Sequence, residues 1–346
     1  MNYIILFLSS FILSLICTPL VRNYALKHNI GLRSREKKVK PIPRLGGVVL
    51  FIVFYFNVLI LYLISPEKLS FVDYKILGID ENLFGLLSAG LVWIVVGLYD
   101  DLKGMNPFSK LFWQFICGLI IVIFGIKIWW LSNPITGGAF IIGDWNYFLV
   151  PVWIVLIMNA LNWFDGIDGL TPGVSTIALI ILFILSINPQ VNQPATALLC
   201  IILAGSVLGF LPYNWSPAKI FLGDSGSMFL GLMIGVFSII SGAKLATAAL
   251  VLGVPIIDAC WVIIRRILSK KSPFYADKNH LHHKFLEAGF TTKQTVIIIY
   301  AICAGFGIIA LESETQGKVK ALVWLLIAMI ILSIVLFIKK YKQNNR

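Results

Sequence analysis

The sequence predicts an all-α polytopic membrane protein: a single integral-membrane domain over residues 1–346 with about eleven transmembrane helices. Hydrophobic residues make up 59% of the chain and its mean hydropathy is +0.91, whereas soluble domains are about 45–50% apolar. A transmembrane helix needs about 20 mainly apolar residues. Eleven segments approach that length, and because they fill most of the chain they leave no room for a sizeable soluble domain. They are, approximately, 2–21, 46–65, 83–99, 109–127, 147–163, 170–187, 195–212, 225–242, 246–266, 295–311 and 321–338.

We interpret the first of these segments, 2–21, as a retained helix and not as a signal peptide. A secretory signal has a basic stretch before its apolar core and a small-residue cleavage site after it. Neither feature is found in this part of the sequence.

The distribution of basic residues predicts how the chain is oriented. The net charge of +12 could by itself indicate a nucleic-acid partner. With the N-terminus outside, however, the inside segments 22–44, 100–110, 212–224, 265–294 and 339–346 carry 22 of the 28 Lys and Arg residues. This asymmetry follows the positive-inside rule and predicts an outside N-terminus and an inside C-terminus. The charge is therefore explained by topology, and no nucleic-acid partner is expected.

The five cysteines indicate neither a disulfide framework nor a metal site. They are odd in number, widely spaced and all inside predicted spans, at Cys17, Cys117, Cys200, Cys260 and Cys303. Such cysteines are expected to act as small apolar core residues.

The stretch 159–170, NALNWFDGIDGL, is the most informative part of the chain. It closes an apolar run and carries Asn159, Asn162, Asp165 and Asp168 at intervals of three residues, which would stack on one face of a 3₁₀ turn. Two carboxylates at a membrane boundary favour a divalent cation and a phosphorylated or polyhydroxylated ligand. The alternative is a polar helix end with two turns, because Asp-Gly pairs are ordinary turn signals.

Two adjacent carboxylates, Asp100 and Asp101, end the third predicted span. They repel each other, and acidic side chains at a helix C-terminus oppose the helix dipole. Local stability does not explain the pair, which therefore indicates a bound cation or a proton-transfer role. Lys110 and Gln114 follow at the start of the fourth span.

Asp224 opens the eighth span within the sequence FLGDSGS. A helix N-cap would be a sufficient reason for an aspartate there. The predicted topology, however, places Asp224 on the same side as Asp100, Asp101, Asp165 and Asp168. We therefore expect five carboxylates from three inside loops to converge on one membrane face.

Three of the four histidines, His280, His282 and His283, lie together in the last inside loop. Asp258 and Arg265 precede them on the ninth span. A histidine cluster can indicate a transition metal, but the cysteine partners and the i, i+4 spacing of zinc sites are absent here. Imidazoles that face a diphosphate or a sugar fit as well, and an interfacial amphipathic segment is the third alternative.

The segment 41–47, PIPRLGG, follows a basic juxtamembrane stretch suited to an anionic leaflet. Its prolines stiffen the entry to the second span, and Gly46 and Gly47 allow close helix packing. Arg44 could meet a phosphate.

Taken in order, these motifs resemble those of the polyprenyl-phosphate N-acetylhexosamine-1-phosphate transferases of glycosyltransferase family 4. Each motif alone is weak, but five in register over essentially the whole chain are specific. They are PIPRLGG, YDD with Lys110 and Gln114 downstream, NALNWFDGIDGL, FLGDSGS and HLHH.

The resemblance implies a reaction and its partners. N-acetylhexosamine-1-phosphate would pass from a UDP-sugar to a polyprenyl phosphate, typically undecaprenyl phosphate, with release of UMP. Mg²⁺ is the implied cofactor, with Mn²⁺ as a substitute, and membrane lipids surround the protein. The implied location is the bacterial inner membrane with the active site facing the cytoplasm, where the product would initiate a cell-envelope glycan. The resemblance is compatible with a homodimer and does not determine the oligomeric state.

The resemblance also assigns roles to residues. Asp224 matches the family aspartate that binds Mg²⁺. Catalytic roles are expected for the four remaining carboxylates, Asp100, Asp101, Asp165 and Asp168. Contacts with the substrates are expected from Arg44, Lys110, Asn159, Asn162, Arg265, His280, His282 and His283.

Within the family, HLHH and PRLGG are similar to the branch that uses UDP-GlcNAc. The muramoyl-pentapeptide branch typically has three consecutive histidines and PTMGG at these places, so UDP-GlcNAc is the predicted donor and the pentapeptide nucleotide the alternative. One departure is that the usual D-x-P…R-K-x-H stretch is replaced by RSREKKVK at 33–40. This leaves the substrate contacts of the first inside loop open.

Two other classes of protein fit the sequence less well. A polytopic transporter would place polar residues near the middle of the membrane and show paired repeats. Here the polar residues gather at the ends of inside loops, and no repeat is visible. A scaffold that had lost catalysis would not be expected to retain every motif carboxylate.

Overall fold

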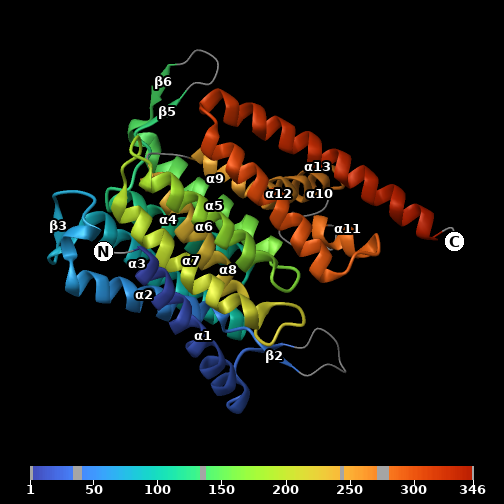
Figure 1. Ribbon diagram of the computed structural model, residues 1–346, viewed down its shortest axis with the longest axis horizontal. Coiled ribbons are helices and arrows are strands. Elements are labelled where there is room, and N and C mark those ends of the chain that lie inside the picture. The colour runs from blue at the N-terminus through green and yellow to red at the C-terminus, as the bar shows by residue number, and fades with distance from the viewer. Residues whose placement is uncertain (1–2, 34–40, 133–137, 242–244, 271–279, 345–346) are drawn as a thin grey trace.

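The protein is a bundle of helices with three short hairpins (Figure 1), seen in a computed structural model that describes residues 3–33, 41–132, 138–241, 245–270 and 280–344. Most of the substituted basic stretch RSREKKVK, at 34–40, lies outside these residues. The helices are α1 (Tyr3–Lys27), α2 (Gly46–Ile64), α3 (Glu81–Lys103), α4 (Pro107–Ile123), α5 (Asn146–Phe164), α6 (Leu170–Ile187), α7 (Pro194–Asn214), α8 (Gly223–Ile240), α9 (Leu245–Val251), α10 (Gly253–Leu268), α11 (Leu281–Glu287), α12 (Thr292–Glu312) and α13 (Thr315–Asn344).

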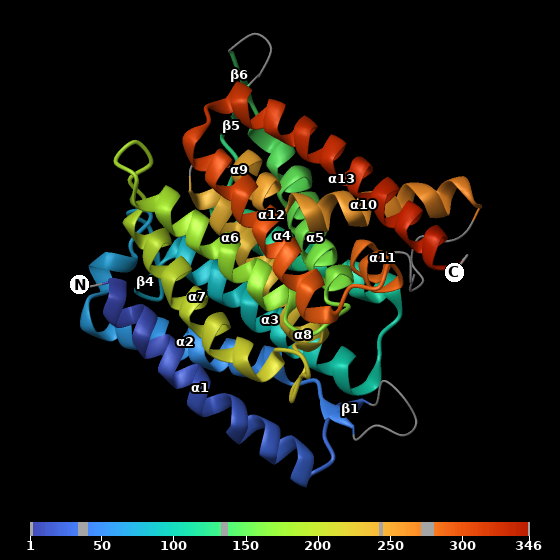
Figure 2. The same cartoon turned by 45° about the vertical axis from the view of Figure 1, so that its right-hand side comes forward.

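The hairpins mark the two ends of the bundle. Each pairs two antiparallel strands: β1 (Leu32–Arg33) with β2 (Ile42–Pro43), β3 (Lys75–Ile76) with β4 (Ile79–Asp80), and β5 (Trp130–Ser132) with β6 (Ala139–Ile141). In Figures 1 and 2 the second and third hairpins lie at one end, whereas β1–β2 and α11 lie at the other.

The predicted all-α polytopic class is confirmed. Within the described ranges, nine helices are long and apolar enough to cross a membrane, or ten if the bent pair α9 and α10 counts as one span. α4 is apolar but shorter, with 17 residues. The count of about eleven stays a prediction.

Helix α8 lies at the centre of the bundle. It packs against α2, α3 and α5, and 89% of its span is buried. α1 and α13 are at the periphery, with only 22% of their spans buried, and they carry apolar side chains on exposed surfaces, as lipid-facing helices do. A Cβ atom on Gly231 would lie 2.5 Å from Cα of Met158, so this glycine brings α8 close to α5.

The ninth predicted span, 246–266, is not one continuous helix. It is broken between α9 and α10, which meet at an angle of 80°. Pro255 explains the break, because its ring would clash with the carbonyl of Val251 four residues earlier and it has no N–H to donate. Residues of α10 after the break are therefore aimed in a new direction.

The glycines of the PIPRLGG segment pack closely, as predicted, and their partner is the FLGDSGS segment. Gly46 N–H donates to the carbonyl of Phe221 at 3.0 Å, and Gly47 N–H donates to that of Leu222 at 2.9 Å. A Cβ atom on Gly47 would lie 2.7 Å from Cα of Gly226. The entry to α2 is thus fixed against the start of α8.

The prediction that the cysteines act as core residues is confirmed for three of them. Cys117, Cys200 and Cys303 are buried, whereas Cys17 and Cys260 are half-buried, and all five are free thiols.

Candidate functional site

An ammonium group lies between two carboxylates at one end of the bundle. Lys110, in the first turn of α4, donates to Oδ2 of Asp224 at 2.7 Å and forms a second ion pair with Oδ2 of Asp100 in the last turn of α3. Asp100 is buried, with 8% of its surface exposed, and its Oδ1 accepts the backbone N–H of Met105 at 2.8 Å. Asp100 and Asp224, which are 124 positions apart in the sequence, therefore meet around one cation.

Asp101 has a different environment from its neighbour. Its Oδ1 accepts the backbone N–H of Asp224 at 2.8 Å, and its Oδ2 accepts the backbone N–H and the hydroxyl of Ser225 at 2.9 and 2.5 Å. The first N–H groups of a helix have no partner within that helix. The N-cap of α8 is therefore supplied by Asp101 from α3, and the alternative that Asp224 caps its own helix is wrong.

Asn162, near the end of α5, completes the cluster around Asp224. Its amide donates to Oδ1 of Asp224 and to Oγ of Ser227, both at 3.0 Å. We name Asp100, Lys110, Asn162 and Asp224 the acidic cluster.

Asn159 lies one turn earlier on α5 and faces another helix. It donates to Oε1 of Gln114 at 2.6 Å, and Gln114 also donates to Sδ of Met228 at 3.1 Å. These contacts join α4, α5 and α8 beneath the acidic cluster. The expected contact of Asn159 with substrate stays a prediction, and its observed contacts are with neighbouring helices.

The turn between α5 and α6 carries the remaining two motif aspartates. Asp165 follows the last residue of α5 and is half-buried. Oδ2 of Asp168 accepts the backbone N–H of Ala218 at 3.1 Å, and Gly169, with φ +82°, donates to Asn214 at 2.9 Å. The turn is thus joined to the loop before α8 that leads to Asp224.

A second group of polar residues lies where α10 meets α11. His280 Nδ1 is 2.7 Å from Oδ2 of Asp258, and the backbone N–H of Leu281 donates to Oδ1 of the same carboxylate at 2.8 Å. Asp258 was not among the predicted site residues. The signal that could have identified it is an acidic residue within an apolar predicted span.

His282 is packed among rings and is fully buried. Its ring is parallel to that of His280 at 5.6 Å between centroids, and it meets Phe164 edge-on at 6.0 Å. A Cβ atom on Gly166 would lie 2.7 Å from its Cε1 atom. Burial, followed by the neighbouring His283 and His280, lowers the pKa of His282 well below its usual value of 6.5. The histidine cluster (His280, His282 and His283) thus rests against the turn that carries Asp165.

The other predicted substrate residues surround these two groups. Arg44 is half-buried, and its backbone lies close to Gly223 at the start of α8. Arg265 is in the last turn of α10 and His283 in the first turn of α11, both half-buried. All three are at the end of the bundle that carries Asp224.

The acidic cluster fits a divalent cation only with help from a ligand. No three His, Cys, Asp or Glu side chains in the described part of the chain are arranged to hold a metal ion. Asp100, Asp101 and Asp224 bring three carboxylates together with a single ammonium, which leaves negative charge for a cation. Mg²⁺ is commonly held by one or two carboxylates together with substrate phosphates, so these residues suit such a site.

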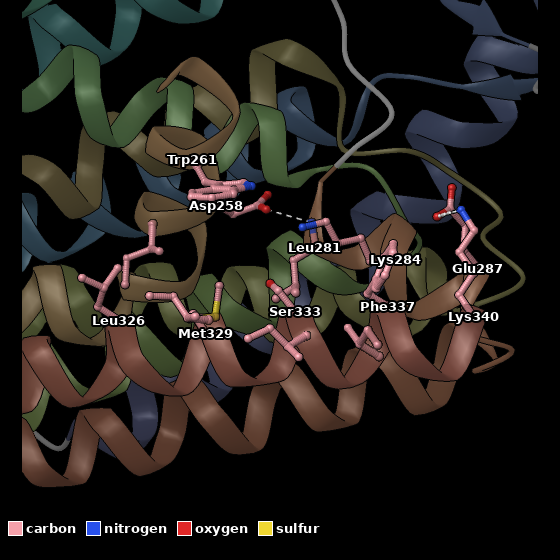
Figure 3. Close-up of a pocket in the computed structure, with 14 residues that line it drawn as sticks. Asp258, Trp261, Leu281, Lys284, Glu287, Leu326, Met329, Ser333, Phe337 and Lys340 are labelled. Atoms are coloured by element: carbon pink, nitrogen blue, oxygen red, sulfur yellow. Dashed lines mark hydrogen bonds and ion pairs between the residues drawn. The ribbon is translucent and has the colours of Figure 1, made fainter. Parts of the chain in front are cut away.

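A cavity of about 530 Å³ lies beside the histidine cluster, between α10, α11 and α13 (Figure 3). Its walls are mainly apolar, and the charged residues Asp258 and Lys284 line it together with the ion pair of Glu287 and Lys340.

Comparison with known proteins identifies the family. Residues 83–242 match the sequence profile of glycosyl transferase family 4. A probable undecaprenyl-phosphate N-acetylglucosaminyl 1-phosphate transferase of Bacillus subtilis is 32% identical over 340 residues, which cover 96% of this chain and 89% of the relative. The chain belongs to glycosyl transferase family 4.

Two further relatives have names that state different transferred groups. A decaprenyl-phosphate N-acetylglucosaminephosphotransferase of Mycolicibacterium smegmatis is 32% identical, with 78% of this chain and 71% of the relative covered. A phospho-N-acetylmuramoyl-pentapeptide-transferase of Limosilactobacillus reuteri is 27% identical, with 90% of this chain and 98% of the relative covered.

Proposed function

We propose that this family 4 enzyme transfers GlcNAc-1-phosphate from UDP-GlcNAc to undecaprenyl phosphate. The products are a lipid-linked sugar diphosphate and UMP, and the product would initiate a cell-envelope glycan. The names of the Bacillus and Mycolicibacterium relatives support the donor sugar and a polyprenyl acceptor. The structural observation that carries the proposal is Lys110 held between Asp100 and Asp224.

The chemistry is a phosphoryl transfer between two anionic substrates. An oxygen of the lipid phosphate attacks the β-phosphorus of the UDP-sugar, and a new P–O bond forms. The bond from that phosphorus to the bridging oxygen breaks, and UMP leaves with the electron pair. A phosphate monoester has a second pKa near 6 and is already largely ionised at neutral pH. A protein base is therefore dispensable, and catalysis depends on positioning and charge stabilisation.

Lys110 and Asn162 are suited to this positioning. An ammonium has three N–H donors, and the contacts with Asp100 and Asp224 take two of them. The third can donate to a phosphate oxygen. The amide N–H of Asn162 donates to Oδ1 of Asp224, the carboxylate oxygen that Lys110 does not contact, and so fixes the orientation of this side chain.

We propose Asp224 as the protein ligand of Mg²⁺, with Mn²⁺ as a substitute. Its side chain keeps 28% of its surface exposed, more than the 5% of the Asp100 side chain. When bound, the metal would neutralise negative charge on the diphosphate. Asp165, at the neighbouring turn, is proposed to face the sugar nucleotide together with the histidine cluster.

We propose that the site faces the cytoplasm of the bacterial inner membrane and that the chain makes eleven spans. The positive-inside distribution supports this orientation, and eleven spans result if α4 and the bent pair α9–α10 each cross once. In a cysteine-free background, Asn106→Cys should react with an impermeant thiol reagent only from the inside, and Ile141→Cys only from the outside. Labelling of both from one face would contradict the topology. Labelling only from the outside is also predicted near Asn133, which lies outside the described residues.

The muramoyl-pentapeptide nucleotide is the alternative donor. The relative from Limosilactobacillus reuteri that is named for that donor is 27% identical, against 32% for the Bacillus and Mycolicibacterium relatives named for GlcNAc. HLHH and PRLGG in place of that branch's motifs favour UDP-GlcNAc as well.

The test is UMP release by the purified protein with undecaprenyl phosphate, Mg²⁺ and a panel of UDP-sugars. We expect turnover with UDP-GlcNAc, little with UDP-glucose because groups that bind the acetamido group would be left unpaired, and none without the lipid phosphate. Preference for the pentapeptide nucleotide would contradict the donor assignment. Absence of UMP release with every donor would contradict the reaction.

A further inference from the structure

The carboxylate of Asp258 connects two segments that the bend in the ninth span brings together. It lies on α10, with 5% of its surface exposed, and both of its oxygens are engaged. Oδ1 accepts the backbone N–H of Leu281, as the dashed line in Figure 3 shows. Oδ2 faces Nδ1 of His280 at 2.7 Å.

Capping of α11 accounts for only one of these oxygens. His280 is the N-cap residue of α11, and its own side chain makes no capping hydrogen bond. Asp258 supplies that bond from outside the helix, for which a single oxygen is sufficient. A buried ionised carboxylate is costly unless it is well paired, so the second oxygen calls for a separate reason.

That reason is the state of the His280 ring. An ionised carboxylate only accepts hydrogen bonds, so Nδ1 of His280 carries the proton that lies between them. In the neutral ring the lone pair is then on Nε2, and the ring is held in one orientation. The hydrogen bond to one ring nitrogen fixes which nitrogen of a histidine is available for function.

The place of His280 gives this arrangement a function. Its ring is parallel to that of His282, which rests against Gly166 next to Asp165. We propose that Asp258 is a positioning residue that fixes the tautomer and the orientation of His280 for contact with the UDP-sugar. This inference rests on the proposed function, because it requires that the histidine cluster contacts the donor.

Asp258→Asn tests the tautomer directly. An asparagine has one oxygen and one NH₂ group, so it cannot accept from both Leu281 and His280. If the asparagine oxygen still accepts the backbone N–H of Leu281, the asparagine NH₂ group faces Nδ1 of His280. Nδ1 must then accept a hydrogen bond, so the ring proton moves to Nε2. We expect kcat/KM for UDP-GlcNAc to fall about 10-fold to 100-fold, by analogy with the loss seen when the orienting partner of a metal-bound histidine is removed. KM for undecaprenyl phosphate should stay within about twofold.

A double-mutant cycle separates positioning from helix capping. If Asp258 acts through His280, Asp258→Asn should cause no further loss of kcat/KM in a His280→Ala background. Glu287→Gln is the matched control, because it removes an exposed ion pair between α11 and Lys340 of α13. This variant should leave kcat/KM unchanged. Thermal unfolding in detergent is measured for each variant.

Two results would overturn the proposal while wild type remains active: an unchanged kcat/KM in Asp258→Asn, or equal losses from Asp258→Asn with and without His280. Where Asp258→Asn does not fold, Asp258→Glu replaces it in the same cycle and is judged in the same way. An inactive wild type would instead contradict the proposed function.

Discussion

Oδ2 of Asp101 accepts both the backbone N–H and the hydroxyl of Ser225, so an aspartate at the end of α3 anchors the first turn of α8. Asp100, its neighbour, contacts Lys110 instead. The two adjacent carboxylates thus have separate partners. One holds the helix that presents Asp224, and the other holds the cation beside it.

Asp101→Ala should therefore act first on stability. Three hydrogen bonds at the start of α8 lose their acceptor, and loss of an N-cap costs about 0.5–2 kcal/mol. Asp101→Asn should be intermediate, because one amide oxygen can still accept. Melting temperatures measured in detergent should decrease in the order wild type, Asp101→Asn, Asp101→Ala. Activity lost in Asp101→Asn with unchanged thermal stability would instead support a direct catalytic role for Asp101.

Lys110→Gln should lower kcat strongly. The variant removes the ammonium that holds Asp100 and Asp224 together and that is proposed to donate to a phosphate oxygen. Removing one preorganised donor at a charged transition state typically costs about 100-fold to 1,000-fold in kcat. The measurement is UMP release at saturating UDP-GlcNAc. Lys103→Gln, at the exposed lysine that ends α3, is the control, and equal activity of both variants would contradict the role of Lys110.

The buried His282 should make the protein less stable in mild acid. Burial lowers the pKa of His282 in the folded protein below its value of about 6.5 in the unfolded chain. As the pH falls through 6.5, the unfolded state takes up a proton that the folded state cannot, so the free energy of unfolding decreases. In His282→Phe, the fall in melting temperature from pH 7.5 to 5.5 should be smaller. His28→Phe, at the exposed fourth histidine, should behave like wild type.

The sequence was sufficient to predict the helical membrane class and the convergence of much of the site. A helix that crosses the hydrocarbon core needs about 20 mainly apolar residues, so apolar runs identify the spans. The polar motifs lie in the loops where the chain leaves the membrane. Asp100, Asp101 and Asp224 meet as expected because α3 and α8 are neighbours in the bundle. Lys110 contacts both Asp100 and Asp224 because α4, which carries it, packs beside α3.

What could not be predicted are the partners of each side chain. The pattern of the sequence gives the two adjacent aspartates equal weight, and only the packing of α3 on α8 separates Asp100 from Asp101. The pairing of Asp258 with His280 depends on the 80° bend between α9 and α10, and the sequence indicates Pro255 but not the direction of the helix that contains it. The interval of three between Asn159 and Asn162 likewise does not show that Asn159 faces Gln114.

Gly166→Ala should disturb the contact between the motif turn and the histidine cluster. The added methyl would lie 2.7 Å from Cε1 of His282, and this ring has little freedom to move, because it is fully buried and has Phe164 and His280 as neighbours. Overpacking of this kind costs about 1–3 kcal/mol. We expect lower thermal stability and a lower kcat/KM for UDP-GlcNAc.

The matched control for this steric argument is Gly305→Ala on α12, where a Cβ atom would meet nothing within 4 Å. Since alanine is favoured over glycine in a helix, this variant should be as stable as wild type or slightly more so. His282→Ala removes the ring that the new methyl would strike, so Gly166→Ala should have a smaller effect in that background. A loss of the same size with and without the imidazole would mean that the substitution acts on the backbone of the 165–169 turn, and not through contact with His282.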